Sequence, residues 1–107
     1  GQQAEQNARS FLEQNGLRFF AQNYHCRRGE IDLIMLDGDE WVFVEVKYRR
    51  DNAFGQAVEY FHQHKRKKVE RAMQQFLHDK RLNPSIVAHR IDVVAIDHDD
   101  VQWLKGV

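Results

Sequence analysis

Hydrophobic residues recur along this chain with two different spacings. In the segment AEQNARSFLEQNG, residues 4–16, an apolar residue returns at every third or fourth position, which predicts an amphipathic helix. Its final Gly16 suits the left-handed position that caps a helix. Residues 17–48 are rich in aromatic and branched side chains and are interrupted by HCRRG and DGD, which predicts three consecutive strands joined by turns.

A second helical pattern covers residues 56 to about 80, where apolar side chains again return every three or four positions. Asn83 and Pro84 are expected to end this helix, because proline lacks an amide donor and disfavours helical geometry in its predecessor. IVAHRIDVVAID then predicts a buried strand, and VQWL a short final strand after the HDD turn. The predicted order is αβββαβ with one further strand, which is an α/β fold.

The size and composition of the chain limit what it can be. A chain of 107 residues favours one domain, residues 1–107, around one core. Sixteen basic and sixteen acidic residues cancel, so attraction to a charged partner must be local. The lone Cys26 makes no internal disulfide, so we expect a cytoplasmic location. The apolar runs are far shorter than the roughly 20 residues that span a bilayer, so no membrane partner is expected.

Charged residues interrupt both apolar segments that flank the DGD turn. If the glycine and second aspartate of this sequence form a two-residue hairpin turn, Asp32 lies opposite Glu45, and Glu30 lies opposite Lys47. A four-residue loop keeps this register, whereas a three-residue loop throws Asp32 and Glu45 onto opposite faces. The face of the charges also carries Ile34, Leu36, Trp41 and Phe43, and the other face carries Ile31, Leu33, Val44 and Val46.

Two directly opposed carboxylates start about 5 Å apart at Cβ and repel each other unless a cation or a proton lies between them. Asp32 and Glu45 are therefore candidate ligands for Mg²⁺, which binds one or two carboxylates and keeps water; Mn²⁺ is the expected substitute. Lys47 points to the same side, where an ammonium stabilises charge that builds on a phosphate. The alternative is that Glu30 and Lys47 form a cross-strand ion pair while both other acids lie on a solvated face.

Two helical residues have similarly open interpretations. Glu5 lies at the edge of the first helix's apolar stripe, where it either reaches over the sheet or stays in water. Lys65 interrupts the apolar row between Phe61 and Val69, although a lysine stem also lies readily along apolar surface with its ammonium in water.

The charges between residues 47 and 71 are mostly basic, eight against three acidic, which is a local balance of plus five. Cations beside an acidic metal site are what a nucleic-acid phosphodiesterase needs, because they hold the backbone. The alternative is a solvated, lysine-rich helix face. The residues expected to contact DNA are Lys65, Lys67, Lys68, Arg49 and Arg50.

The sequence GEIDLI, with Asp32 thirteen residues before the Glu45 of VFVEVKYR, resembles the PD-(D/E)xK nuclease signature. Five ordered blocks are similar to the bacterial YraN-like family of predicted endonucleases, which is related to archaeal Holliday-junction resolvases. The blocks are AEQNARSFL, NYHCRRGEIDLIMLD, FVEVKYR, AVEYFHQHKRKKVERAMQQFL and HRIDVVAID. They cover nearly the whole chain. Ile31 stands where the signature has a proline that the superfamily often lacks.

This resemblance implies the restriction-endonuclease-like fold, a mixed sheet flanked by helices in αβββαβ order. It also implies a catalytic set and a metal-binding set that overlap. The matching positions are Asp32, Glu45 and Lys47 for the core triad, Glu5 and Glu30 for accessory acids, and Lys65 for a lysine near the site. Glu5 joins Asp32 and Glu45 as a metal ligand, and Glu30 assists catalysis.

Three functions are consistent with these observations. The first is a Mg²⁺-dependent endonuclease on DNA, with branched or damaged DNA as candidate substrates. Resolution of branched DNA by two active sites implies a homodimer. The second is a non-catalytic nucleic-acid-binding or adaptor domain with a nuclease-like fold, which binds DNA in a salt-sensitive way and ignores Mg²⁺. The third is a protein-interaction domain whose charges only solvate its surface.

Overall fold

The computed structural model describes residues 2–48, 58–97 and 100–107. The helices are α1 (Gln2–Gln14) and α3 (Arg66–Asp79), and a π-helix (Phe61–Lys65) leads into α3. The strands are β1 (Arg18–Cys26), β2 (Gly29–Asp37), β3 (Glu40–Tyr48), β4 (His89–Asp97) and β5 (Asp100–Leu104). The element order predicted from the sequence is confirmed, including the short last strand.

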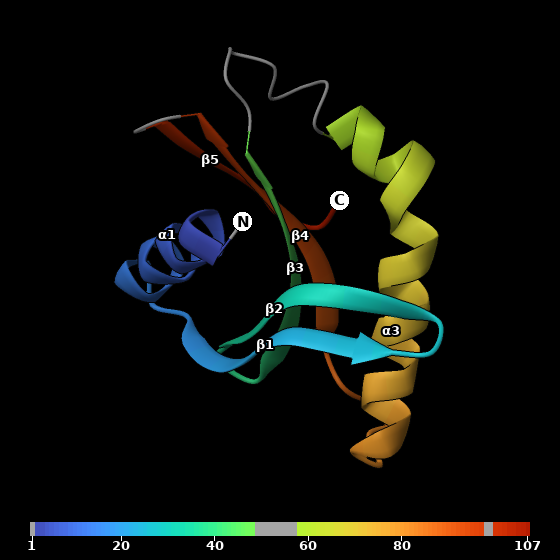
Figure 1. The fold of residues 1–107 in the computed structure, drawn as a ribbon. Helices are drawn as coiled ribbons and strands as arrows, with labels where there is room; N and C mark the ends of the chain where they lie inside the picture. The colour runs from blue at the N-terminus through green and yellow to red at the C-terminus, as the bar shows by residue number, and fades with distance from the viewer. Residues whose placement is uncertain (1, 49–57, 98–99) are drawn as a thin grey trace.

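The five strands form one mixed sheet in the order β1-β2-β3-β4-β5. Neighbouring strands are antiparallel except β3 and β4, which are parallel and are joined through the long helix. Figure 1 shows α1 on one side of the sheet and α3 on the other, so the molecule has three layers. Within the described ranges, no helix combines the length and the apolar character that crossing a membrane requires.

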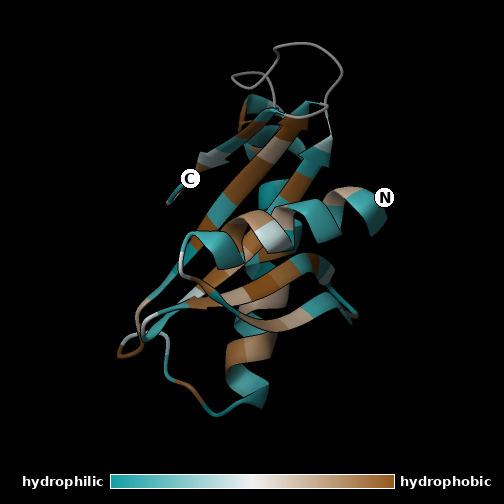
Figure 2. Ribbon diagram, turned by 90° about the vertical axis from the view of Figure 1, so that its left-hand side faces the viewer, coloured by the Kyte–Doolittle hydropathy of each residue, from teal (hydrophilic) through white to brown (hydrophobic). Residues whose placement is uncertain are grey.

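Each face of the sheet has its own hydrophobic core. The face under α1 buries Ala8 and Leu12 against Leu33, Val44 and other residues of the strands. The face under α3 is centred on aromatic residues, and its main members are Phe43, Phe61, Phe76, Ile31, Ile34 and Val93. Figure 2 shows hydrophobic segments along the central strands, whereas much of α1 is hydrophilic. Both helices therefore bury only a stripe, as their sequence periodicity predicts.

The C-terminal ends of α1 and α3 test the residues that the sequence predicts to terminate each helix. Gly16 follows α1 with φ +94°, which confirms it as a left-handed cap. In contrast, α3 ends at Asp79, before the predicted stop at Asn83 and Pro84. Arg81 takes the left-handed conformation with φ 58°, and the Leu82 amide donates to the Leu77 carbonyl at 2.8 Å. This hydrogen-bond pattern closes a helix without proline, so the helix length was right and its predicted cause was wrong.

The β2–β3 hairpin has the predicted register where its strands pair. Asp37 pairs with Glu40, so Gly38 and Asp39 form the turn, and Gly38 has the positive φ that a type II′ turn requires. The paired region ends at Leu33 and Val44.

Beyond that pair, β2 continues only with β1, as far as Gly29. Figure 1 shows the result, because β1 and β2 cross the view while β3 and β4 run nearly vertically. The side-chain alternation changes at this fork. Ile31 packs with Ile34 and Phe43 under α3, so the prediction that Ile31 shares a face with Leu33 was wrong.

A polar network holds the opposite end of the sheet. The guanidinium of Arg90 on β4 donates from Nε to both oxygens of the buried Asp92, at 3.0 and 3.2 Å. Its Nη1 donates to Asp37 at 3.1 Å and to Glu40 at 2.6 Å, the two residues that flank the hairpin turn. Asp92 also accepts from Trp103 Nε1 at 2.8 Å, so the network ties β5 to β4 and β4 to the β2–β3 hairpin.

Gly29 starts β2 directly against α3. A Cβ atom at this position would lie 2.0 Å from the carbonyl oxygen of Lys68, which is main chain and cannot rotate away. We expect Gly29→Ala to separate the β1–β2 turn from α3 and to lower the free energy of unfolding by about 1–3 kcal/mol, the usual cost of overpacking. Denaturant titration checks this. Arg28→Ala, at the neighbouring exposed turn residue, is the control and should change stability by less than about 0.5 kcal/mol. Equal stability of both variants would contradict the contact.

Candidate functional site

Asp32 lies at the fork where β2 leaves β3. The amide of Val46, which a continued ladder would pair with a main-chain oxygen of β2, donates instead to Asp32 Oδ2 at 2.9 Å. A hydrogen bond to a charged acceptor stabilises by roughly 1.5–3 kcal/mol. The carboxylate therefore takes the place of a strand partner and is held in one orientation beside β3.

Glu45 lies on β3 next to this carboxylate and exposes only 6% of its surface. Burial raises the pKa of Glu45 to about 7, and the charge of Asp32 and a hydrogen bond between the two side chains contribute further. The nearby Lys47 acts in the opposite direction. The two acids that the hairpin register predicts as neighbours are thus in contact, and the contact favours the protonated form of Glu45.

Lys47 is the cation of this cluster. Its Nζ lies 3.2 Å from Glu45 Oε2, and the lysine side chain is only 15% exposed. The ammonium also lies 4.8 Å from the centre of the Tyr60 ring, next to the π-helix. A lysine held by an acid and an aromatic face has a fixed position, which a residue that stabilises a developing charge requires.

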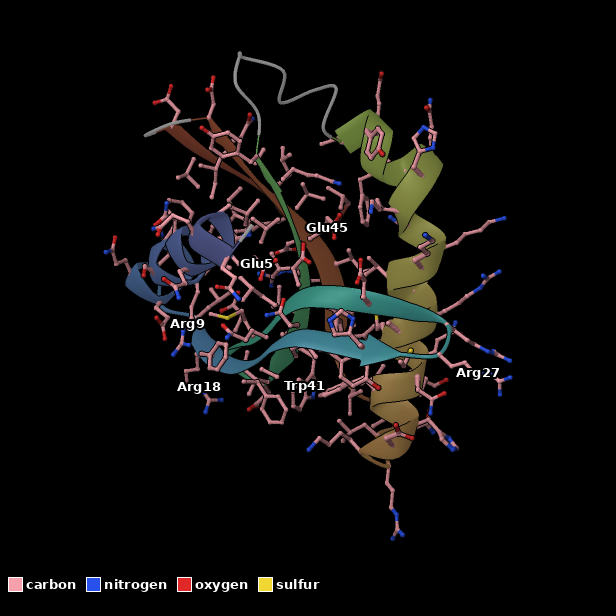
Figure 3. The ribbon with its side chains drawn as sticks, in the orientation of Figure 1. Glu5, Arg9, Arg18, Arg27, Trp41 and Glu45 are labelled. Atoms are coloured by element: carbon pink, nitrogen blue, oxygen red, sulfur yellow. The ribbon has the colours of Figure 1, made fainter. Side chains whose placement is uncertain are left out.

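Glu5 reaches this cluster from the other side of the sheet. It is half-buried on α1, and its pKa is raised by burial and then by the negative charges of Asp32 and Glu30. Figure 3 shows Glu5 on the side of α1 that faces the sheet, with Glu45 on β3 beyond it. Of the two open interpretations, the half-buried position and the influence of Asp32 favour the one in which Glu5 reaches over the sheet, which stays a prediction. A polar cavity of about 120 Å³ adjoins it, lined by Gln2, Glu5, Gln6, Gln22 and Asn23.

Glu30 is displaced from the position that an unbroken hairpin predicts. It is exposed and lies 3.3 Å from His25 Nδ1 on β1, whereas Lys47 pairs with Glu45. The alternative of a Glu30–Lys47 ion pair is therefore wrong, because the strands have separated before these positions. Glu30 nevertheless lies two residues before Asp32 on β2, and its charge contributes to the raised pKa of Glu5.

The predicted DNA-contacting residues are spread along the second helix. Lys65 is half-buried at the end of the π-helix, and a single π-helical turn often accompanies a functional site. Lys67 and Lys68 are exposed in the first turns of α3. Arg49 and Arg50 lie outside the residues that the structure describes.

The cluster offers a metal ion few protein ligands. In the described part of the chain, no three histidine, cysteine or acidic side chains are placed to hold a metal ion together. Mg²⁺ is usually bound through one or two carboxylates and otherwise by water and substrate phosphate, and the adjoining Asp32 and Glu45 provide that number. Their donor chemistry therefore fits Mg²⁺ or Mn²⁺ and does not fit a closed structural site.

Two arginines of the β1–β2 turn escaped the sequence prediction. Arg27 and Arg28 connect Cys26 to Gly29 and are both exposed. With Lys68 they line an open hollow of about 350 Å³ between the turn and α3. The signal was present in HCRRG, where two adjacent cations stand in a turn close in sequence to Asp32.

The raised pKa of Glu45 makes stability depend on pH. Its pKa is about 7 in the folded chain and near the ordinary 4.5 when unfolded, so the folded chain binds the proton more tightly. Stability is therefore lost as pH rises from about 4.5 through about 7, by roughly 3 kcal/mol from this group. We expect Asp32→Asn, which keeps an acceptor for Val46 but removes the charge, to reduce this loss. Denaturant titrations from pH 5 to 8 test this, and identical pH dependence in wild type and variant would refute it.

Comparisons with known proteins agree over the whole chain. The model of "Uncharacterised protein family UPF0102" matches residues 4–96. A UPF0102 protein of Colwellia psychrerythraea (strain 34H) is 47% identical over 99% of this chain and 85% of its own length. A UPF0102 protein of Shewanella pealeana is 44% identical over 98% of this chain and 91% of its own length. A UPF0102 protein of Pseudomonas fluorescens (strain Pf0-1) is 45% identical over 99% of this chain and 89% of its own length. The chain therefore belongs to the UPF0102 family, which is the YraN-like family.

Proposed function

We propose that this protein is a Mg²⁺-dependent endonuclease of the PD-(D/E)xK superfamily that hydrolyses phosphodiester bonds in DNA, with residues 1–107 forming one nuclease domain. The observation that carries the proposal is the contact of the Asp32 and Glu45 carboxyls at the fork, with the Lys47 ammonium 3.2 Å from Glu45. An α/β fold with a mixed sheet between two helices is consistent with the restriction-endonuclease-like fold.

In this proposal Asp32 and Glu45 hold the divalent cation, with Glu5 as a further ligand from α1. The cation supplies Lewis-acid activation of the water and of the phosphate. For it to bind, the proton that Glu45 holds below about pH 7 must leave, and the cation then relieves the repulsion between the two carboxylates. Glu30, whose charge acts on Glu5, adds negative charge at the border of the site.

Lys47 acts on the substrate. In hydrolysis the water oxygen bonds to phosphorus, the bond from phosphorus to the leaving sugar oxygen breaks, and negative charge builds on the phosphate oxygens that are not displaced. The Lys47 ammonium, fixed between Glu45 and the Tyr60 ring, is placed to stabilise that charge. Lys65, Lys67, Lys68, Arg49 and Arg50 hold the DNA backbone. On branched DNA the protein acts as a homodimer, with one centre for each strand cut.

A second function, DNA binding without catalysis, is favoured by a different observation. In the described residues the acidic cluster lacks a three-ligand metal group, and exposed lysines stand on α3. This alternative predicts DNA affinity that falls with salt, ignores Mg²⁺ and survives Asp32→Asn.

The first test of catalysis is Lys47→Ala. The purified protein should nick supercoiled and branched DNA with Mg²⁺ or Mn²⁺, and the variant should lose turnover by about 10²–10³-fold while keeping its DNA affinity, because Lys47 acts on transition-state charge. Lys80→Ala, which removes a lysine at the other end of α3, is the control and should cut like the wild type. Equal rates of DNA cutting by both variants would show that Lys47 is not a catalytic residue.

The metal site is tested separately by titrating Mn²⁺ without DNA. Because Glu45 must lose its proton, Mn²⁺ affinity should rise about tenfold for each pH unit below pH 7 and level off above it. The double variant Asp32→Asn, Glu45→Gln should bind Mn²⁺ at least about tenfold more weakly, and Asp37→Asn, an acid at the hairpin turn, should bind it normally. Unchanged affinity in the double variant would exclude these carboxyls as ligands.

A further inference from the structure

The β1–β2 turn and the start of α3 border a hollow whose two turn arginines have no role in the catalytic proposal. It has a volume of about 350 Å³ and is open to solvent. Its ionisable lining consists of three cations, one carboxylate and two further side chains, namely Arg27, Arg28, Lys68, Glu30, His25 and Cys26. The only carboxylate in the lining already faces His25 at 3.3 Å. The hollow is therefore cationic, although the whole chain is neutral.

The two walls of the hollow are fixed relative to each other. Gly29 brings the turn against the main chain of α3 at Lys68, so closely that a Cβ atom would collide with it. Arg27 and Arg28 follow a regular antiparallel pairing that ends at Cys26 and Gly29. The turn thus has a set position on the helix, and the cations of both elements belong to one surface. Figure 3 shows Arg27 beside α3, at the opposite end of the hairpin from Arg18.

The cationic surface continues along α3. Lys67, Lys68 and Arg71 fall within a sector of about 100° on the helix, and all are exposed. Together with the two turn arginines they make five cations, none of which forms an ion pair with another described residue. By contrast, the half-buried Arg9 pairs with Glu13, and Arg66 pairs with Glu70. Neighbouring cations without an acidic partner among the described residues attract a polyanion.

The position of the hollow relates it to the acidic cluster. Glu30 lines the hollow and lies two residues before Asp32 on β2, so the hollow and the acidic cluster are neighbours along this strand. A DNA strand whose phosphates contact the turn arginines and Lys68 would therefore lie beside the part of β2 that carries Asp32. The hollow is open and its cationic side chains are exposed, which suits a backbone contact better than an enclosed small anion.

We propose that the hollow between the β1–β2 turn and α3 is a binding site for backbone phosphates of DNA, with Arg27 and Arg28 on one wall and Lys68 on the other. The site deepens the proposed nuclease function, on which the choice of DNA as partner rests. It positions the strand on the side of the catalytic centre marked by Glu30. Arginine suits this role because its guanidinium presents several donors in one plane to phosphate oxygens.

The test measures binding of a short labelled duplex with EDTA present, so that no cutting occurs. The variant Arg27→Gln, Arg28→Gln should bind every duplex about tenfold more weakly at low salt, and the slope of log K against log salt should become shallower by about 2, since each lost phosphate contact removes about 0.9. Lys68→Gln should weaken binding by itself and by a smaller factor in the double-arginine background, because both walls hold the same phosphates.

The matched control is Arg18→Gln, Arg81→Gln, which makes the same change in net charge at other exposed positions and should leave the slope unchanged. A slope that falls equally in both double variants would overturn the inference. A second outcome would also overturn it. If inorganic phosphate displaces DNA more strongly than chloride does at equal ionic strength, and the double-arginine variant loses this effect, the hollow is a site for a small anion.

The outcomes for the two proposals separate. If the wild type cuts DNA with Mg²⁺ but substitution of the turn arginines leaves the salt slope unchanged, the nuclease proposal is supported and the DNA site in the hollow is refuted. If substitution of the arginines weakens binding but the wild type shows no Mg²⁺-dependent cutting, the DNA site is supported and the catalytic assignment is refuted. Unchanged thermal unfolding of the variants shows that each keeps its fold.

Discussion

The separation of β2 from β3 after Leu33 and Val44 is the constraint on which the acidic cluster depends. In a hairpin that stayed paired, the Val46 amide would donate to a main-chain oxygen of β2, and side chains would alternate strictly between the two faces. Because the strands diverge, that amide is free for the Asp32 carboxylate, which comes to lie beside β3 and not on one face of it. From there it interacts with Glu5 of α1 and with Glu45 of β3, so one carboxylate connects the α1 layer to the sheet.

How far the sequence predicts this arrangement depends on the range of the interaction. The DGD turn is local, and it sets the register that brings Asp32 near Glu45. The divergence that moves Ile31 to the other core is not local, because it results from β1 and β2 packing on α3 while β3 follows β4. Alternation alone therefore placed Ile31 and Glu30 incorrectly.

Other features were missed for related physical reasons. A left-handed arginine at the end of α3 is rare enough that proline was the better stop signal, although Arg81 takes this role. Arg90 and Asp92 lie in a strand whose apolar neighbours dominate its pattern, and their partners come from distant residues. The basic turn was visible in the sequence, but its meaning depends on the Gly29 contact with α3, which no periodicity encodes.

The charges at the fork are hard to explain by stability alone. If Glu45 served only to pair with Lys47, a neighbouring Asp32 charge would be a disadvantage, because it raises the pKa of Glu45 and favours the neutral acid that pairs less well with the ammonium. If Asp32 served only to accept the Val46 amide, an asparagine would accept it without repelling Glu45. A purely structural role would therefore favour a neutral residue at position 32. Only the two acids together offer adjacent anionic oxygens to a cation beside the Lys47 ammonium. For this reason we favour a metal-dependent function over a purely structural one.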